Sequence, residues 1–169
     1  MDLPVVSDIF TKSFEVRWDD TDFNGHLRNT RYLEYAGTAR MHHLMSMGWD
    51  VRMLRKVGFA PILLGDEISY RREVYLAERV DVSCEIVGLS SDRARWRMRH
   101  VVSREDGTAA AVAHCLCAWL DVETRRIAPP PAGLQEAMEA ARAEDCVVIG
   151  SQYASSDSAS GPVRASSEA

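Results

Sequence analysis

Residues 18–48 read WDDTDFNGHLRNTRYLEYAGTARMHHLMSMG and join a strand-like stretch to the longest helical pattern of the chain. Acidic residues, an asparagine and a histidine are concentrated between Asp19 and Leu27, directly before the helix. The first-turn amides of a helix have no intrahelical partners, so they can bind a group that carries negative charge. The segment therefore indicates both a central helix and a candidate functional site beside its start.

The apolar and small residues of this segment recur at helical spacing and predict a helix from Thr30 to about Met47. Asn29 is expected to cap its first turn, and Gly48 to end it. Gly37 lies inside the predicted helix and costs about 1 kcal/mol relative to alanine. We therefore expect a close approach of backbone at Gly37 as compensation.

Outside this segment the sequence indicates mainly strands. Alternating patterns predict strands over 13–18, 61–72, 79–89, 93–103 and 108–122, with short helices over 50–56 and 133–142. One long helix followed by an antiparallel run is typical of an α+β fold in which one sheet curls around one helix. The strand over 108–122 is apolar on both faces, which favours a second subunit as cover for one of them.

The chain has 169 residues, which suits one domain, expected over residues 1–150, followed by a disordered tail over 151–169 that is rich in serine and alanine. A net charge of -5 argues against nucleic-acid binding. No apolar run is long enough to cross a membrane, and residues 1–12 lack the features of a signal peptide. A cytoplasmic location is the resulting expectation.

Cysteines and arginines are the remaining candidates for ligand binding. Cys115 and Cys117 share one face of a predicted strand and could chelate a metal, but buried thiols are the favoured interpretation and no metal site is expected. Four arginines alternate on one face of the strand over 93–103, which suits phosphate recognition or, more ordinarily, a solvated face. The arginines of that face are Arg93, Arg95, Arg97 and Arg99.

The pattern D-x-D-x-N-G-H-x-x-N-x-x-Y-L over 20–33 resembles the hotdog-fold thioesterases, in particular the hydroxybenzoyl-CoA thioesterase-like branch of acyl-CoA thioesterases. The likeness extends over about residues 14–134 and includes PILLGD at 61–66 and WLDVETRRIAPPP at 119–131. It implies an antiparallel sheet wrapped around one long central helix. It also implies a homodimer or a dimer of dimers with active sites at the subunit boundary, and no metal or organic cofactor.

The resemblance assigns the catalytic acid to Asp22, with His26 and Asn24 in support. Asp22 as a turn aspartate is the alternative, and Asp19 and Asp20 are expected to be structural. The loop and the helix start are expected to bind the substrate through Gly25, Asn29, Thr30, Tyr32 and Glu34. Glu34 is also the rival catalytic acid, because some members of the family place theirs on the central helix.

The implied reaction is hydrolysis of an acyl-CoA thioester to a free acid and coenzyme A. Two alternatives share the same fold: hydrolysis of acyl groups on an acyl carrier protein, and binding of acyl groups without hydrolysis. The chain departs from the family pattern at Gly37, where the family often has a glutamate three residues before the arginine that stands here as Arg40. The role that the family gives to this glutamate therefore does not carry over to this chain, and the class of substrate can differ as well.

Overall fold

The structure is a computed structural model, and it describes residues 9–150. The predicted tail over 151–169 lies outside the described residues. The elements are β1 (Phe10–Glu15), η1 (Trp18–Asp20), α1 (Asn29–Ser46), α2 (Val51–Val57), β2 (Phe59–Tyr70), β3 (Arg79–Ser90), β4 (Arg95–Arg104), β5 (Ala109–Asp121), β6 (Arg126–Ile127), α3 (Ala132–Ala140) and β7 (Arg142–Ile149).

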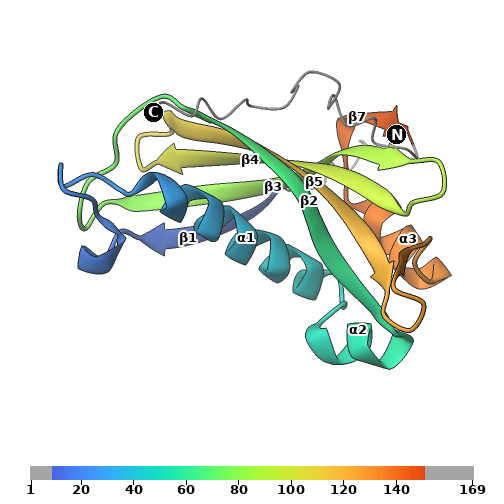
Figure 1. Ribbon diagram of the computed structural model, residues 1–169. Coiled ribbons are helices and arrows are strands. Elements are labelled where there is room, and N and C mark those ends of the chain that lie inside the picture. The colour runs from blue at the N-terminus through green and yellow to red at the C-terminus, as the bar shows by residue number, and fades with distance from the viewer. Residues whose placement is uncertain (1–8, 151–169) are drawn as a thin grey trace, which may run out of the picture.

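The strands form one seven-stranded sheet in the order β1-β3-β4-β5-β2, with β6 paired to β5 and β7 paired to β3. All pairs are antiparallel except β3 with β7, which is parallel. Figure 1 shows the sheet curving over α1, which runs along its concave side. The predicted α+β hotdog arrangement, a sheet wrapped around one long helix, is therefore confirmed.

The core lies between α1 and the concave face of the sheet. The helix contributes Tyr35, Ala36, Ala39 and Leu44, all of them buried. The sheet contributes Trp96 and Trp119, whose rings stack with centroids 4.5 Å apart, together with buried residues at every second position of β4 and of β3 as far as Ile86. This alternation is the period of two that the sequence shows, and it fixes which face of each strand meets the helix.

Two boundaries at the ends of the chain differ from the sequence-based expectation. The first strand runs over Phe10–Glu15 and not over 13–18, because its pairing with β3 begins at Phe10 and Cys84. The helix predicted over 133–142 ends at Ala140, and the chain continues into β7, which was not predicted. The pattern of 142–149 is not apolar enough to indicate a strand. The segment becomes a strand because it pairs with residues 86–90 of β3, which β1 leaves unpaired, and this contact between distant parts of the chain is not visible in the local sequence.

The expected close approach at Gly37 is wrong, and the close approach occurs at Gly88. A Cβ added at Gly37 would meet Arg40 Nη2 at 3.8 Å and no described atom of the sheet within 4 Å. A Cβ added at Gly88 would lie 2.8 Å from Cγ2 of Ile149 and 3.2 Å from Cβ of Arg97. Gly88 is thus the position that lets β7 pack beside β3, while Gly37 only thins the half-buried side of α1.

Candidate functional site

The loop before α1 is closed around the side chain of Asp22. Oδ1 of Asp22 accepts hydrogen bonds from the backbone amides of Asn24 (2.8 Å) and His26 (3.2 Å). The Asp22 amide donates to the His26 carbonyl at 2.8 Å, and Gly25 takes a positive φ of 75° at the turn. Within residues 9–150, the second carboxylate oxygen, Oδ2, accepts no hydrogen bond. Asp22 therefore holds the turn with one oxygen and keeps the other for a ligand.

The helix begins one residue earlier than predicted. Arg28 is the N-cap, in an extended conformation and without a side-chain cap hydrogen bond, and Asn29 is already helical. The prediction that Asn29 caps the helix is therefore wrong. The early start follows from the amide of Arg28, which donates to the Asp20 carbonyl at 2.8 Å and directs the chain into the helix there. Within residues 9–150 the amides of Asn29 and Thr30 donate no hydrogen bond and are available to a ligand, while the Arg31 amide donates to the Arg28 carbonyl at 2.9 Å.

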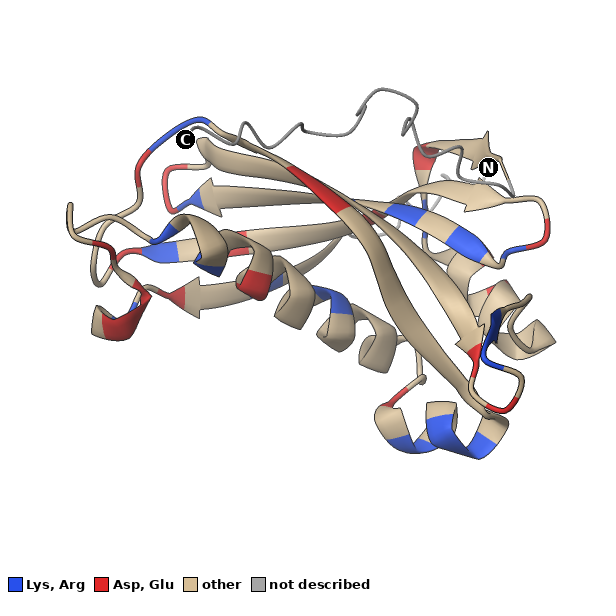
Figure 2. Ribbon diagram, viewed as in Figure 1, with Lys and Arg blue, Asp and Glu red and all other residues tan. Residues whose placement is uncertain are grey.

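Asp22 and the helix start line one open cavity of about 280 Å³. The loop and helix contribute Asp22, His26, Leu27, Asn29 and Tyr32, and the end of β2 with the residues after it contributes Tyr70, Arg71, Arg72 and Glu73. Figure 2 shows charged residues of both signs gathered at this end of the molecule, around the start of α1 and the segment after β2. The arrangement offers a carboxylate, free amide donors and cations around one space.

Aromatic contacts fix two of the lining residues. The rings of Tyr32 and Tyr70 stand at 78° with centroids 5.3 Å apart, and the Tyr70 hydroxyl donates to the Asn29 carbonyl at 3.1 Å. His26 lies edge-on to Tyr75, with centroids 5.0 Å apart. Burial first, and then the nearby Tyr70, Glu73 and Asp22, raise the pKa of Tyr32 to about 12, so Tyr32 is a neutral phenol at pH 7.

Asp20 holds the loop in place through hydrogen bonds and an ion pair of its buried carboxylate. The side chain of Asp20 is 7 % exposed, and its carboxylate accepts hydrogen bonds from the Tyr35 hydroxyl (2.6 Å) and the Arg17 amide (3.0 Å), with Nε of Arg31 at 3.0 Å. Burial by itself would raise the pKa of Asp20, but these hydrogen bonds and the charges of Arg31 and Arg17 hold it below its ordinary value. The position agrees with the structural role expected for Asp20.

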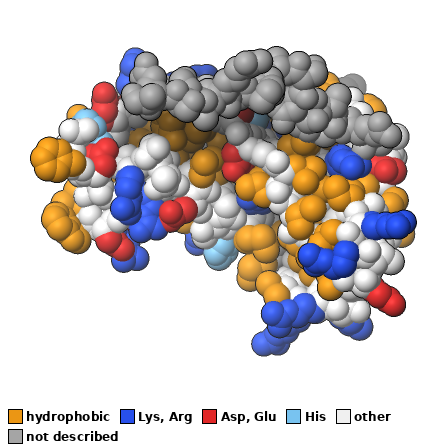
Figure 3. Space-filling view, in the orientation of Figure 1, with side chains coloured by type: hydrophobic (Ala, Val, Ile, Leu, Met, Phe, Trp, Pro, Cys, Tyr) orange, Lys and Arg blue, Asp and Glu red, His pale blue; other side chains and the backbone are white. Residues whose placement is uncertain are grey.

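Four of the eight predicted site residues line the cavity, namely Asp22, His26, Asn29 and Tyr32, and four do not. Asn24 and Gly25 form the exposed turn that Asp22 closes. Thr30 is exposed, and Glu34 pairs with Arg31 on the outer side of the helix. Figure 3 shows apolar side chains and a histidine exposed at this end. The catalytic and binding roles stay predictions.

Five lining residues were not among the predicted site residues, namely Leu27 in the loop and Tyr70, Arg71, Arg72 and Glu73. The sequence places the last four of these at and after the end of a strand, 48 to 51 residues after Asp22. What brings them to the helix start is the pairing of β2 with β5 along almost its whole length, from Phe59 to Tyr70. A cluster of charged residues directly after a strand was the only local signal.

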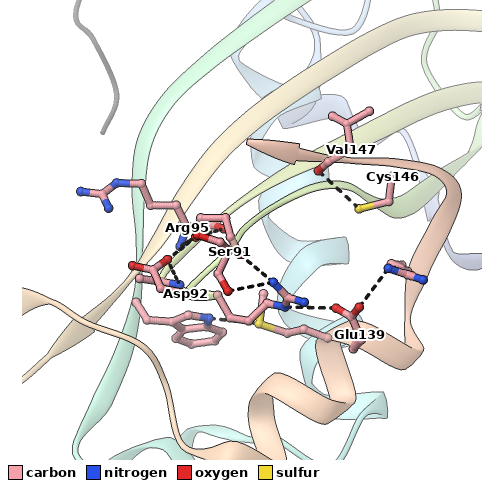
Figure 4. A network of polar contacts seen from close by, with 12 residues as sticks. Ser91, Asp92, Arg95, Glu139, Cys146 and Val147 are labelled. Atoms are coloured by element: carbon pink, nitrogen blue, oxygen red, sulfur yellow. Dashed lines mark hydrogen bonds and ion pairs between the residues drawn. The ribbon is translucent and has the colours of Figure 1, made fainter. Parts of the chain in front are cut away.

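Two of the four arginines predicted on one strand face, Arg93 and Arg99, pair with carboxylates. Arg99 pairs with Glu85 (3.0 Å) and Asp145 (2.8 Å). Arg93 lies in the β3–β4 turn, outside the strand in which it was predicted, and pairs with Glu139 at 3.1 Å. Figure 4 shows this network at the β3–β4 turn and α3, with Asp92 and Glu139 among its members. The arginines beside the candidate site are Arg71 and Arg72.

The cysteines are thiols in the described part of the chain. Burial raises the pKa of Cys115 to about 12 and that of Cys117 to about 11. Among residues 9–150, no group of three or more His, Cys, Asp or Glu side chains is arranged to hold a metal ion. None of the helices described there is long and apolar enough to cross a membrane.

Two curated proteins are among those similar to this chain. One is the L-carnitine dehydrogenase/betainyl-CoA thioesterase of Agrobacterium fabrum, 27 % identical over 124 residues, which are 73 % of this chain and 25 % of that protein. The other is Protein THEM6 of Xenopus laevis, 30 % identical over 112 residues, which are 64 % of this chain and 53 % of that protein. The chain thus spans between a quarter and about half of the length of these relatives.

Comparison with solved structures shows the same fold. Protein SAV2348 of Staphylococcus aureus, solved in complex with CoA, superposes with a TM-score of 0.73 at 19 % identity, over 80 % of this chain and 86 % of that one. The 1,4-dihydroxy-2-naphthoyl-CoA thioesterase Slr0204 of Synechocystis gives a TM-score of 0.68 at 24 % identity, over 76 % and 94 %. Residues 16–138 match the family described as the Thioesterase-like superfamily. The chain belongs to the Thioesterase-like superfamily.

Proposed function

We propose that the protein hydrolyses acyl-CoA thioesters to a free acid and coenzyme A. The observation that carries the proposal is that the Asp22 carboxylate and the uncapped start of α1 line the same cavity. Thioester hydrolysis needs a group that activates the nucleophile and donors where negative charge develops on the carbonyl oxygen. Asp22 supplies the first, and the first-turn amides of α1 supply the second.

The free oxygen of Asp22 acts on the substrate by one of two routes. As a base it takes a proton from water, whose oxygen then attacks the thioester carbon. As a nucleophile it attacks that carbon itself and forms an anhydride, which water opens. In both routes the C–S bond breaks, the sulfur leaves as the CoA thiolate and takes up a proton, and the free acid is released. His26, at the same cavity wall, orients the carbonyl or the water.

Arg71 and Arg72 serve the coenzyme. Both are exposed and border the cavity at the end of β2, so a CoA whose thioester reaches Asp22 can place phosphate oxygens near them. The relatives support a CoA substrate, since one is named for a betainyl-CoA thioesterase and one solved neighbour holds CoA. An acyl carrier protein as carrier is the competing substrate.

The proposal is tested by thiol release from a panel of short, long, aromatic and betainyl CoA thioesters. Wild-type protein is expected to release CoA from at least one of them faster than the buffer does. The same acyl groups attached to an acyl carrier protein form the second arm. Faster hydrolysis of these thioesters than of the CoA thioesters would show that the carrier protein is the preferred substrate. Release from no substrate in either arm would contradict hydrolysis and leave acyl binding as the function.

The protein is further proposed to form a homodimer, alone or as a unit of a dimer of dimers, through the free edge of β2. β2 ends the strand order, and Leu63 and Leu64 on it are 49 % and 41 % exposed. An exposed apolar edge strand pairs readily with another edge. Sedimentation is expected to give a mass of two or four times 18.9 kDa.

Leu64→Lys is expected to shift the protein to monomer, because lysine on an edge strand opposes pairing. Leu76→Lys is the matched control, since Leu76 is 49 % exposed but lies off the strand. A wild-type monomer, or a shift caused equally by both variants, would contradict the proposed edge.

A further inference from the structure

One side of α1 leads away from the candidate site and ends at a cation. Asn29, which lines the site cavity, is followed at intervals of four residues by Leu33 and Gly37, and Arg40 comes three residues later. Residues three or four apart share one side of a helix, so these four form a continuous row. Leu33, Gly37 and Arg40 are half-buried, which places the row at the boundary between the core and the surface.

β2 runs alongside this row in the opposite direction. Near the helix start, the Tyr70 hydroxyl at the end of β2 donates to the Asn29 carbonyl at 3.1 Å. Further along the helix, Pro61 near the start of β2 lines an apolar cavity together with Arg40. Figure 1 shows β2 passing α1 between these two contacts. Ile68 lies between them on β2 and packs against the core, so an apolar strand residue borders the path from Asn29 to Arg40.

Gly37 leaves open space on this path. Apart from the neighbouring helix backbone, a Cβ added at Gly37 would have one described atom within 4 Å, namely Nη2 of Arg40 at 3.8 Å. Long side chains of a helix bend toward its N-terminus, and the guanidinium of Arg40 accordingly lies beside Gly37, on the side of the site. The described chain therefore leaves room for a slender group next to Gly37, with the guanidinium at its far end.

Arg40 has no carboxylate partner in the described part of the chain. None of the ion pairs within residues 9–150 includes it. The helix residues three and four positions away are not acidic: Ala36, Gly37, His43 and Leu44. A charge that is partly removed from water is stabilised by an opposite charge. The surroundings of this guanidinium therefore suit an anion that a ligand supplies.

The path closes beyond Arg40. The apolar cavity that Arg40 lines has a volume of about 30 Å³, which is room for about one water molecule. Its other walls are large side chains of the core, among them Trp96, Trp119 and Met138. An acyl group that enters from the site therefore ends near Arg40, and its terminal group meets the guanidinium.

The helix geometry sets the length of such an acyl group. The guanidinium lies at the level of Gly37, seven residues beyond Thr30, whose amide is available to the thioester oxygen. A rise of about 1.5 Å per residue puts the two donors about 10 Å apart along the helix axis. Hydrogen bonds of about 3 Å at both ends leave the span of an acyl chain of about five to seven carbons.

One acidic residue borders the same path from the strand side. Asp66 lies two residues before Ile68 on β2 and therefore shares its face of the sheet. Asp66 is exposed, whereas Arg40 is half-buried. Solvent and salt screen exposed charges more strongly than partly buried ones, so Arg40 has the larger effect on a bound group.

We infer that the site selects monothioesters of dicarboxylic acids with about five to seven carbons, whose free carboxylate is bound by Arg40. This inference rests on the proposed hydrolysis of acyl-CoA, and it adds the class of acyl group together with the residue that recognises it.

The test compares two substrates of equal shape. Adipoyl-CoA and adipamoyl-CoA have the same chain and differ only in the terminal group, a carboxylate in the first and a neutral amide in the second. The expected kcat/KM is about tenfold or more higher for adipoyl-CoA, because a charge-assisted bond to a guanidinium is stronger than a neutral one. Equal values, or a preference for the amide, would overturn the inference.

The advantage of the carboxylate is also expected to depend on chain length. Succinyl-CoA is too short to reach Arg40, and sebacoyl-CoA is too long for the closed end of the path. For each of these two, the ratio of its kcat/KM to that of its own amide is therefore expected to lie near one. The same ratio at all three lengths would contradict a carboxylate site at a fixed distance from the thioester.

Variants of Arg40 assign the preference to its charge. Arg40→Gln is expected to lower the ratio of kcat/KM for adipoyl-CoA to that for adipamoyl-CoA by about tenfold, while Arg40→Lys keeps most of it. Arg52→Gln is the matched control, since Arg52 is exposed on α2, away from this path, and the ratio is expected to stay as in wild type. An unchanged ratio in Arg40→Gln would contradict the role of Arg40.

Gly37→Glu tests the same charge without removing it. A glutamate three residues before an arginine pairs with it on a helix, and the space beside Gly37 admits one. This variant is expected to lower the ratio by about fivefold or more, because its carboxylate pairs with Arg40 and repels that of the substrate. Gly37→Gln has the same size without the charge and is expected to change the ratio by less than about twofold. Equal ratios in the two variants would contradict an anion site at Arg40.

The design separates this inference from the proposed function. If other acyl-CoA thioesters are hydrolysed but adipoyl-CoA and adipamoyl-CoA are not distinguished, only the inference fails. If no thioester is hydrolysed, the proposed function fails, and calorimetry with the two corresponding thioethers, which cannot be hydrolysed, still decides the inference. The thioether with the carboxylate is then expected to bind about tenfold more tightly than the one with the amide. Equal affinities would overturn Arg40 as an anion site.

Discussion

Asp22→Asn is expected to lower kcat for the best acyl-CoA substrate by about 10³-fold, within the range that a positioned base or nucleophile contributes. The substitution is matched to the structure. Asn Oδ1 can accept the hydrogen bonds that Asp22 takes from the amides of Asn24 and His26, so the turn is kept. What is lost is the charge and basicity of the other oxygen. Thiol release under saturating substrate measures the effect.

Asp19→Asn is the control for this variant. Asp19 is half exposed, pairs with Arg17 at 2.8 Å outside the cavity, and belongs to the same acidic loop. Its kcat is expected to stay within about twofold of wild type, because an exposed pair contributes little. If Asp22→Asn retains the turnover of Asp19→Asn, Asp22 is not the catalytic acid, and Glu34 becomes the candidate to test. Thermal unfolding of both variants shows whether the fold is intact.

Much of the fold was predictable because its signals are local. The helix over 30–47 and the strand over 79–89 were predicted within one residue of their observed limits, Asn29–Ser46 and Arg79–Ser90. Both patterns record which side chains are buried, and burial follows from the period of each element. β7 was not predicted, because its residues form a strand only through pairing with the part of β3 that β1 does not cover.

The site was predictable only on the side that one continuous segment supplies. Asp22, His26 and Asn29 follow one another along the loop and the helix start, so sequence proximity placed them together. Tyr70 and Glu73 reach the cavity through the register of β2 with β5. Register depends on pairing between distant strands and is not encoded by the spacing of residues within either strand. The half of the cavity wall that Tyr70 and Glu73 supply is thus set by strand register, and the local sequence signals it only by the charged residues after β2.

Asp20 connects the fold to the site, since the same residue binds the start of the loop, the helix and the chain after β1. Its partners are the Arg17 amide, the Tyr35 hydroxyl and Arg31. The Asp20 carbonyl also accepts from the amide of Arg28, the N-cap of α1. The position of the start of α1 therefore depends on Asp20, a buried residue that does not line the cavity.

Asp20→Asn is expected to lower the free energy of unfolding by about 3 kcal/mol at pH 7, and the melting temperature by about 10 °C. The carboxylate is buried and accepts from two donors beside Arg31. An asparagine can accept at one end only, and its amide would face a donor at the other, which leaves buried groups unpaired. Denaturant unfolding of both proteins measures the difference, and Asp19→Asn is expected to change stability by less than about 0.5 kcal/mol.

The pH dependence identifies the charge as the cause. The pKa of Asp20 in the folded protein lies below its ordinary value, so the carboxylate contributes stability above its unfolded pKa of about 3.9 and loses that contribution as pH falls through its folded pKa. The gap between wild type and Asp20→Asn is therefore expected to be full at pH 7 and to shrink below about pH 4. A gap that stays constant into strong acid would mean that shape, and not the buried charge with its donors, accounts for the loss. Tyr35→Phe in both backgrounds then isolates one donor, because its effect should largely vanish once Asp20 is asparagine.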